Sequence, residues 1–180
     1  INAQNNNDAG ANNNIGWNGL GAQDVLRDGQ PHTYTWVLPD TLTAKIALAD
    51  DSIGWFELAL VSNLDGASVT KFYIDNIQIV GVPVATGKST DTIIGNWEQS
   101  MDGWVVGGGA DVRYSDVNGV TLDQYSLDVW VPTGAWATVL SLNLLDPNQA
   151  GALAAFRTNT KITADITHLV ADWPVDDIPP

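Results

Sequence analysis

The chain has 180 residues, enough to bury one sizeable hydrophobic core, and 44% of them are hydrophobic, which argues against disorder. Seven basic residues face 21 acidic ones, so the formal net charge is −14. A surface this negative repels phosphate backbones, which excludes nucleic acid as the expected partner. No apolar run is long enough to span a bilayer, so we expect no membrane insertion. Cysteine is absent, which removes disulfides, thiol catalysis and cysteine-based zinc sites.

The pattern predicts β-structure along the whole chain. Short runs rich in Val, Ile, Thr, Tyr and Trp are separated by Gly, Asn, Asp and Pro, which favour turns. Only residues 147–157 have a helical or irregular pattern. Regular short strands with turn signals between them are typical of an all-β sandwich. The predicted strands are 33–38, 55–62, 72–80, 125–131, 135–144 and 161–167.

Two segments lack a strand pattern. Residues 5–14 (NNNDAGANNN) predict a polar low-complexity loop, because Asn and Gly tolerate a left-handed backbone. Residues 84–93 (VATGKSTDTI) contain few large apolar groups, and we interpret them as a linker. This linker separates residues 1–83 from residues 94–180.

Two motifs flank the linker. Residues 73–77 read Tyr-Ile-Asp-Asn-Ile, and residues 97–104 read Trp-Glu-Gln-Ser-Met-Asp-Gly-Trp. They resemble the closing and opening motifs of a secreted jelly-roll β-sandwich, galactose-binding-like, of the type used as a carbohydrate-binding module. The segment Gly119–Leu127 is similar to a further part of that family. Because the closing motif comes first, the resemblance implies the C-terminal half of a jelly roll over 1–83 and the N-terminal half over 94–180.

The inverted order leaves three arrangements open. The two halves could combine within one chain as a circular permutant, with one complete sandwich per chain. The front half of one chain could instead complete the back half of the next, which would build a head-to-tail fibre. The abrupt start at Ile1 and the Pro179-Pro180 end also fit a piece excised from a tandem array. Isolated halves are not expected, because their strand edges and apolar faces would be bare.

Exposed aromatic rings are the main candidates for ligand binding, because the C–H faces of sugars stack on them. The chain has eight tryptophans. Alternation puts Leu127, Val129 and Val131 on one face of a strand, so Trp130 is expected on the opposite, non-core face. Trp130 could there contact a glycan, pack under a loop or meet a neighbouring subunit. The full set of glycan candidates is Trp130, Trp136, Trp17, Trp173, Tyr114 and Tyr125.

The remaining tryptophans lie in or beside strand motifs, and we expect them in the core. They are Trp36, Trp55, Trp97 and Trp104.

The resemblance also implies a structural calcium ion, since related modules hold one between their first and last strands. It places one ligand on Glu98 and one on Asp75. Calcium binds six to eight oxygens and readily uses carboxylates, so the chemistry is suitable. The alternative is that Asp75 and Asn76 form a bend at a strand end and that Glu98 is a solvated edge charge.

We therefore expect a non-catalytic carbohydrate-binding module at the cell surface or outside the cell, with a polysaccharide or other glycan as its partner. The alternative is a self-assembling structural repeat of a surface fibre or layer, whose partners are copies of itself. A glycan-active enzyme is the weakest interpretation. The adjacent carboxylates at 50–51 and 176–177 are more typical of solvated turns than of an acid/base pair, and no Gly-x-Ser-x-Gly motif occurs.

Overall fold

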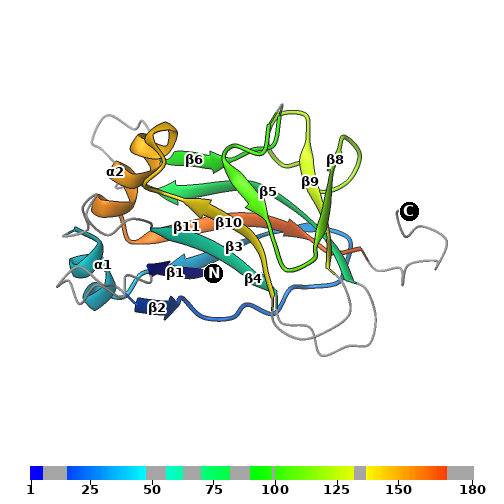
Figure 1. Ribbon diagram of the computed structural model, residues 1–180. Helices are drawn as coiled ribbons and strands as arrows, with labels where there is room; N and C mark the ends of the chain where they lie inside the picture. The colour runs from blue at the N-terminus through cyan, green and yellow to red at the C-terminus, as the bar shows by residue number, and fades with distance from the viewer. Residues whose placement is uncertain are drawn as a thin grey trace.

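The structure is a computed structural model that describes residues 1–5, 16–47, 56–62, 70–81, 90–98, 100–131 and 137–169. In these residues two antiparallel sheets pack against each other as a β-sandwich (Figure 1). The prediction of an all-β sandwich is confirmed, and the arrangement is compatible with a jelly roll.

The first sheet has the strand order β2-β1-β4-β10-β7. Its strands are β1 (Asn2–Asn5), β2 (Gly16–Gly19), β4 (Glu57–Ser62), β7 (Trp104–Val106) and β10 (Ala137–Asn143).

The second sheet has the order β3-β11-β5-β9-β8, and β6 pairs with β5 beside β9. Its strands are β3 (Pro31–Val37), β5 (Thr70–Val80), β6 (Thr92–Gly95), β8 (Asp111–Ser115), β9 (Ser126–Val131) and β11 (Lys161–Thr167). Strand β6 begins inside the range interpreted as a linker, and the Gly81 N–H donates to the Asp91 carboxylate at 2.7 Å just before it.

Both sheets contain strands from 1–83 and from 94–180. Strand β4 pairs with β10 in the first sheet, and β5 lies between β11 and β9 in the second. Within this single chain, each segment therefore supplies neighbours to the strands of the other.

Two short helices lie at the same end of the sandwich (Figure 1). The helix α2 (Ala150–Thr158) follows the 3-10 turn η2 (Pro147–Gln149), which confirms the helical pattern predicted there. The expectation that no other region is helical was wrong, because α1 spans Asp40–Ala47. In α1, Leu42 and Ile46 are one turn apart and bury the same face. Among the described residues, neither helix has the length or hydropathy needed to cross a membrane.

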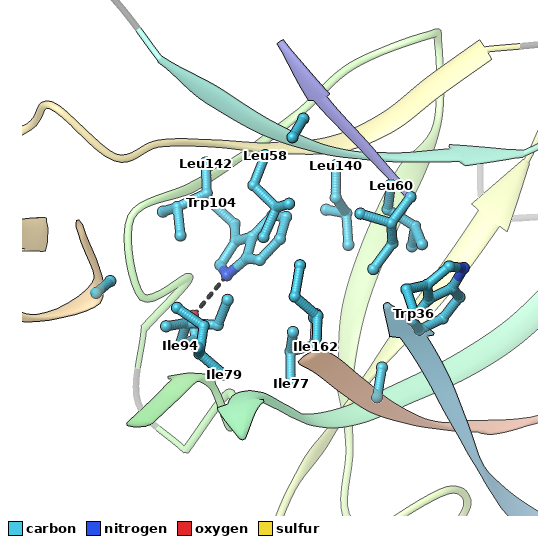
Figure 2. Close-up of a cluster of buried hydrophobic side chains, with 14 of the residues drawn as sticks. Trp36, Leu58, Leu60, Ile77, Ile79, Ile94, Trp104, Leu140, Leu142 and Ile162 are labelled. Atoms are coloured by element: carbon cyan, nitrogen blue, oxygen red, sulfur yellow. Dashed lines mark hydrogen bonds between the residues drawn. The ribbon is translucent and has the colours of Figure 1, made fainter. Parts of the chain in front are cut away.

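The core fills the space between the two sheets. Figure 2 shows Leu58, Leu140 and Leu142 of the first sheet facing isoleucines of the second. Close packing of this kind supplies most of the stability of a small domain. Three of the four tryptophans predicted for the core are buried there, and Trp55 lies outside the described residues. The three confirmed residues are Trp36, Trp97 and Trp104.

Candidate functional site

One surface hollow brings together several of the predicted site residues. It has a volume of about 450 Å³ and is lined by Glu98, Tyr114, Gln124 and Tyr125. Tyr114 lies in the edge strand β8 and is 48% exposed. Gln124 and Tyr125 precede β9, and Glu98 follows β6. The described wall of the hollow is therefore built by three separate parts of the chain.

The Glu98 carboxylate connects two walls of the hollow. Its Oε1 accepts the backbone N–H of Gln124 at 2.9 Å and that of Tyr125 at 2.8 Å. Among the described residues, none donates a hydrogen bond to Oε2. One carboxylate oxygen thus fixes the loop before β9, and the other keeps its acceptor capacity.

The same loop is fixed a second time by Asp75, which is fully buried in β5. Its Oδ2 accepts the backbone N–H of Thr121 at 2.7 Å and that of Leu122 at 2.8 Å. Burial raises the pKa of the Asp75 carboxyl, and the hydrogen bonds from Thr121, Leu122 and Asn76 oppose that rise. The loop that carries Gln124 and Tyr125 is therefore held at both ends by carboxylates.

A second buried carboxylate, Asp165, lies opposite Asp75 in the ladder between β11 and β5. The Thr121 hydroxyl oxygen is 2.7 Å from Asp165 Oδ2 and 3.2 Å from Asp75 Oδ2. One hydroxyl has one proton, so it donates to only one of these carboxylates at a time. In the other contact the hydroxyl oxygen faces a carboxylate oxygen with no proton between them, so their lone pairs repel. A proton or a cation shared by the two carboxylates would reduce this repulsion.

The two predicted calcium ligands both hold the loop before β9. Asp75 and Glu98 bind different peptide groups of the same loop. In the described part of the chain, no group of three or more His, Cys, Asp or Glu side chains could hold a metal ion. Asp75 and Asn76 do not form a bend at a strand end, since both lie inside β5, where Asn76 has a positive φ of 50° and the register with β11 shifts between Thr163 and Asp165. Calcium binding by Asp75 and Glu98 stays a prediction.

Trp130 lies on the face of β9 that alternation predicts, but it is not an open platform. Its side chain is only 6% exposed. The Lys71 Nζ lies 4.5 Å from the centre of the Trp130 ring and 2.7 Å from Asp128 Oδ2. The alternation of the strand indicates a face, whereas exposure depends on what covers that face. A role of Trp130 in glycan binding stays a prediction.

The other aromatic candidates do not join the hollow in the described residues. Trp17 lies in β2, because Gly16–Gly19 pairs with β1. It is exposed, as predicted, at the edge of the first sheet, whereas β8 and the hollow belong to the second. Trp136 and Trp173 lie outside the described residues.

Sequence reasoning missed Gln124, Asp165 and the buried pair of Lys71 and Asp128. Gln124 stands beside the predicted Tyr125, but no spacing rule singles it out. The other three residues alternate with core residues along their strands, and this pattern alone predicts exposure. Comparisons with protein-family models, curated proteins and solved structures found no match to this chain.

Proposed function

We propose that this chain is a non-catalytic carbohydrate-binding module with a jelly-roll fold, which acts at the cell surface or outside the cell. The glycan binds in the hollow lined by Tyr114, Tyr125, Gln124 and Glu98. The observation that supports this proposal is the meeting of two tyrosine rings with one amide and one carboxylate. Aromatic rings take the C–H faces of a sugar, and the polar groups take its hydroxyls.

The hydrogen bonds around the hollow also favour binding. The loop 121–125 is tied to β5 through Asp75 and to the segment after β6 through Glu98. A site held in place before the ligand arrives loses less conformational entropy on binding. We therefore expect the hollow to keep its shape when it is empty.

We expect Tyr114→Ala and Tyr125→Ala each to weaken glycan binding about thirtyfold, because truncating an aromatic residue at the centre of a binding site costs about 2 kcal/mol when it is a hot spot. Affinity electrophoresis against a panel of soluble polysaccharides identifies the ligand, and calorimetry with the retained glycan measures the loss.

The matched control is Trp17→Ala, which removes an exposed ring from the other sheet and is expected to leave the affinity within about twofold. Unchanged binding in both tyrosine variants would remove the hollow from the proposal. A loss in Trp130→Ala or Trp136→Ala alone would then move the site to those residues.

A second candidate function is self-assembly into a fibre or layer. The terminal strands of both sheets carry exposed large apolar side chains. In the first sheet these are Trp17 of β2 and Val105 of β7, and in the second they are Val37 of β3 and Tyr114 of β8. Exposed edge strands with apolar side chains favour pairing with another chain.

A structural calcium ion is also part of the proposal. The buried carboxylates of Asp75 and Asp165 share the Thr121 hydroxyl, and a cation beside them would offset their mutual repulsion. Glu98, the other ligand that the family resemblance implies, retains one acceptor oxygen among the described contacts.

We expect millimolar calcium to raise the unfolding temperature by several degrees relative to chelator, because a ligand that binds only the folded state stabilises it. Asp75→Asn should reduce this shift. Light scattering in both conditions, over a series of protein concentrations, separates the two functions. A calcium-stabilised monomer favours the glycan module, and a concentration-dependent polymer favours self-assembly. An unfolding temperature that is the same with calcium and with chelator would contradict the calcium assignment.

A further inference from the structure

The only charged side chain among the described residues that line the hollow is Glu98. Its neighbours there are Tyr114, Gln124 and Tyr125, which are neutral at ordinary pH. Arg113 stands next to Tyr114 on β8, but successive side chains of a strand point to opposite faces. Arg113 pairs with Asp128 in the ladder between β8 and β9. The described lining of the hollow is therefore anionic.

The Glu98 carboxylate is also held in a defined position. Two peptide N–H groups bind Oε1, at 2.8 and 2.9 Å, and no described residue donates to Oε2. An ionised carboxylate oxygen only accepts hydrogen bonds, and its strongest donors are cationic. The free oxygen thus selects for a ligand that brings a positively charged N–H group.

The two tyrosine rings add to this preference. The face of an aromatic ring attracts an ammonium group, and the attraction grows when the group is partly removed from water. A hollow that combines tyrosine rings with one fixed carboxylate offers both kinds of contact. The net charge of −14 also draws polycations toward the chain and repels uronate or sulfate groups.

We propose that the hollow recognises the protonated amine of an amino sugar, so that the preferred ligand is a glycan with free primary amines rather than a neutral or acidic one. This inference rests on the proposed function and names its substrate class. The amine donates to Glu98 Oε2, the tyrosine rings cover the sugar and the ammonium group, and Gln124 binds a hydroxyl.

The test compares oligomers of glucosamine with oligomers of the same length in which every amine is acetylated. Both share one backbone, and they differ in the acetyl group and in the positive charge, so the pH series separates the effect of the charge. Calorimetry in chelator, at a pH where the amines are protonated, is expected to show at least about tenfold tighter binding of the free-amine oligomer, the gain typical of one charge-assisted hydrogen bond. Raising the pH until the amines lose their protons should abolish the difference.

Glu98→Gln should remove this preference, so that the two oligomers bind with similar affinity. Glutamine keeps a side-chain oxygen that can accept from Gln124 and Tyr125, so thermal unfolding should change little. Gln124→Glu, which adds a carboxylate to the hollow, should increase the ratio of free-amine to acetylated affinity. Asp24→Asn is the charge-matched control, because it removes one negative charge from an exposed residue outside the hollow.

The outcomes separate the two proposals. If both oligomers bind equally and lose affinity in Tyr114→Ala, the glycan site stands and the amine preference is wrong. If Asp24→Asn weakens the free-amine oligomer as much as Glu98→Gln does, the attraction belongs to the net charge, and the assignment to Glu98 is wrong. If neither oligomer binds, nor any glycan of the polysaccharide panel, the proposed function fails and the amine preference fails with it.

Discussion

Replacing Lys71 with methionine is expected to lower the free energy of unfolding by about 3–5 kcal/mol, because it leaves a buried carboxylate without its partner. The side chains of Lys71 and Asp128 are 9% and 10% exposed, and their charged atoms lie 2.7 Å apart. The ammonium group also lies 4.5 Å from the centre of the Trp130 ring and 5.0 Å from that of Tyr73. Burial raises the pKa of the Asp128 carboxyl, and Lys71 opposes that rise. Urea unfolding followed by tryptophan fluorescence measures the loss.

The control is the double variant in which Asp128→Leu accompanies Lys71→Met. Two apolar residues remove both charges together, and replacing a buried ion pair in this way is often neutral or stabilising. We therefore expect the double variant to recover most of the loss. A single variant that costs less than about 1 kcal/mol would instead show that the pair is solvated, as surface salt bridges are.

Trp130 illustrates what alternation along a strand can and cannot predict. Leu127, Val129 and Val131 belong to the core cluster, as their spacing indicates, and Trp130 lies outside it. Yet every residue of β9 is buried. Strand β9 lies between β5 and β8, and Lys71 of β5 lies against the Trp130 ring. Spacing along one strand carries no information about contacts from residues far away in the sequence.

The success of the strand predictions also depended on how much of the signal is local in the sequence. Long runs rich in β-branched and aromatic residues predicted β3, β5, β9 and β11 closely, and residues 161–167 match β11 at both ends. Short strands such as β2 (GWNG) and β7 (WVV) were missed. Strands of three or four residues have too few positions to show a period, and they form because a partner strand is already in place.

The candidate site could be predicted in part. Tyr114 and Tyr125 were candidates from their residue type alone. Their meeting with Glu98 depends on hydrogen bonds that link Glu98 to residues 26 and 27 positions away. The family resemblance suggested a metal ligand at Glu98, whereas the hollow gives this carboxylate a second possible use. Side-chain convergence of this kind follows from the tertiary fold and has no local sequence signal.

The second large loss of stability is expected for substitutions of Trp104, in the motif Trp97–Trp104. Trp104 is 3% exposed, its ring centre lies 6.0 Å from that of Trp97, and its indole N–H donates to the Ile94 carbonyl at 2.6 Å (Figure 2). We expect Trp104→Ala to cost about 3–5 kcal/mol, because it leaves a large cavity between the sheets. Trp104→Phe should cost about 1–3 kcal/mol, since it retains a ring but leaves the Ile94 carbonyl without its donor. Denaturant unfolding of both variants measures the two losses.

The neighbouring residue provides the matched control. Val105 points to the opposite side of β7 and is 63% exposed, so Val105→Ala should change the free energy of unfolding by less than about 0.5 kcal/mol. The Asp102 carboxylate accepts the backbone N–H groups of Asn96 and Trp97, which closes the turn that presents both tryptophans to the core. Equal losses in Trp104→Ala and Trp104→Phe would show that Trp104 stabilises the fold through its hydrogen bond to Ile94 and not through ring packing. A small loss in both would mean that the motif does not stabilise the sandwich through its second tryptophan.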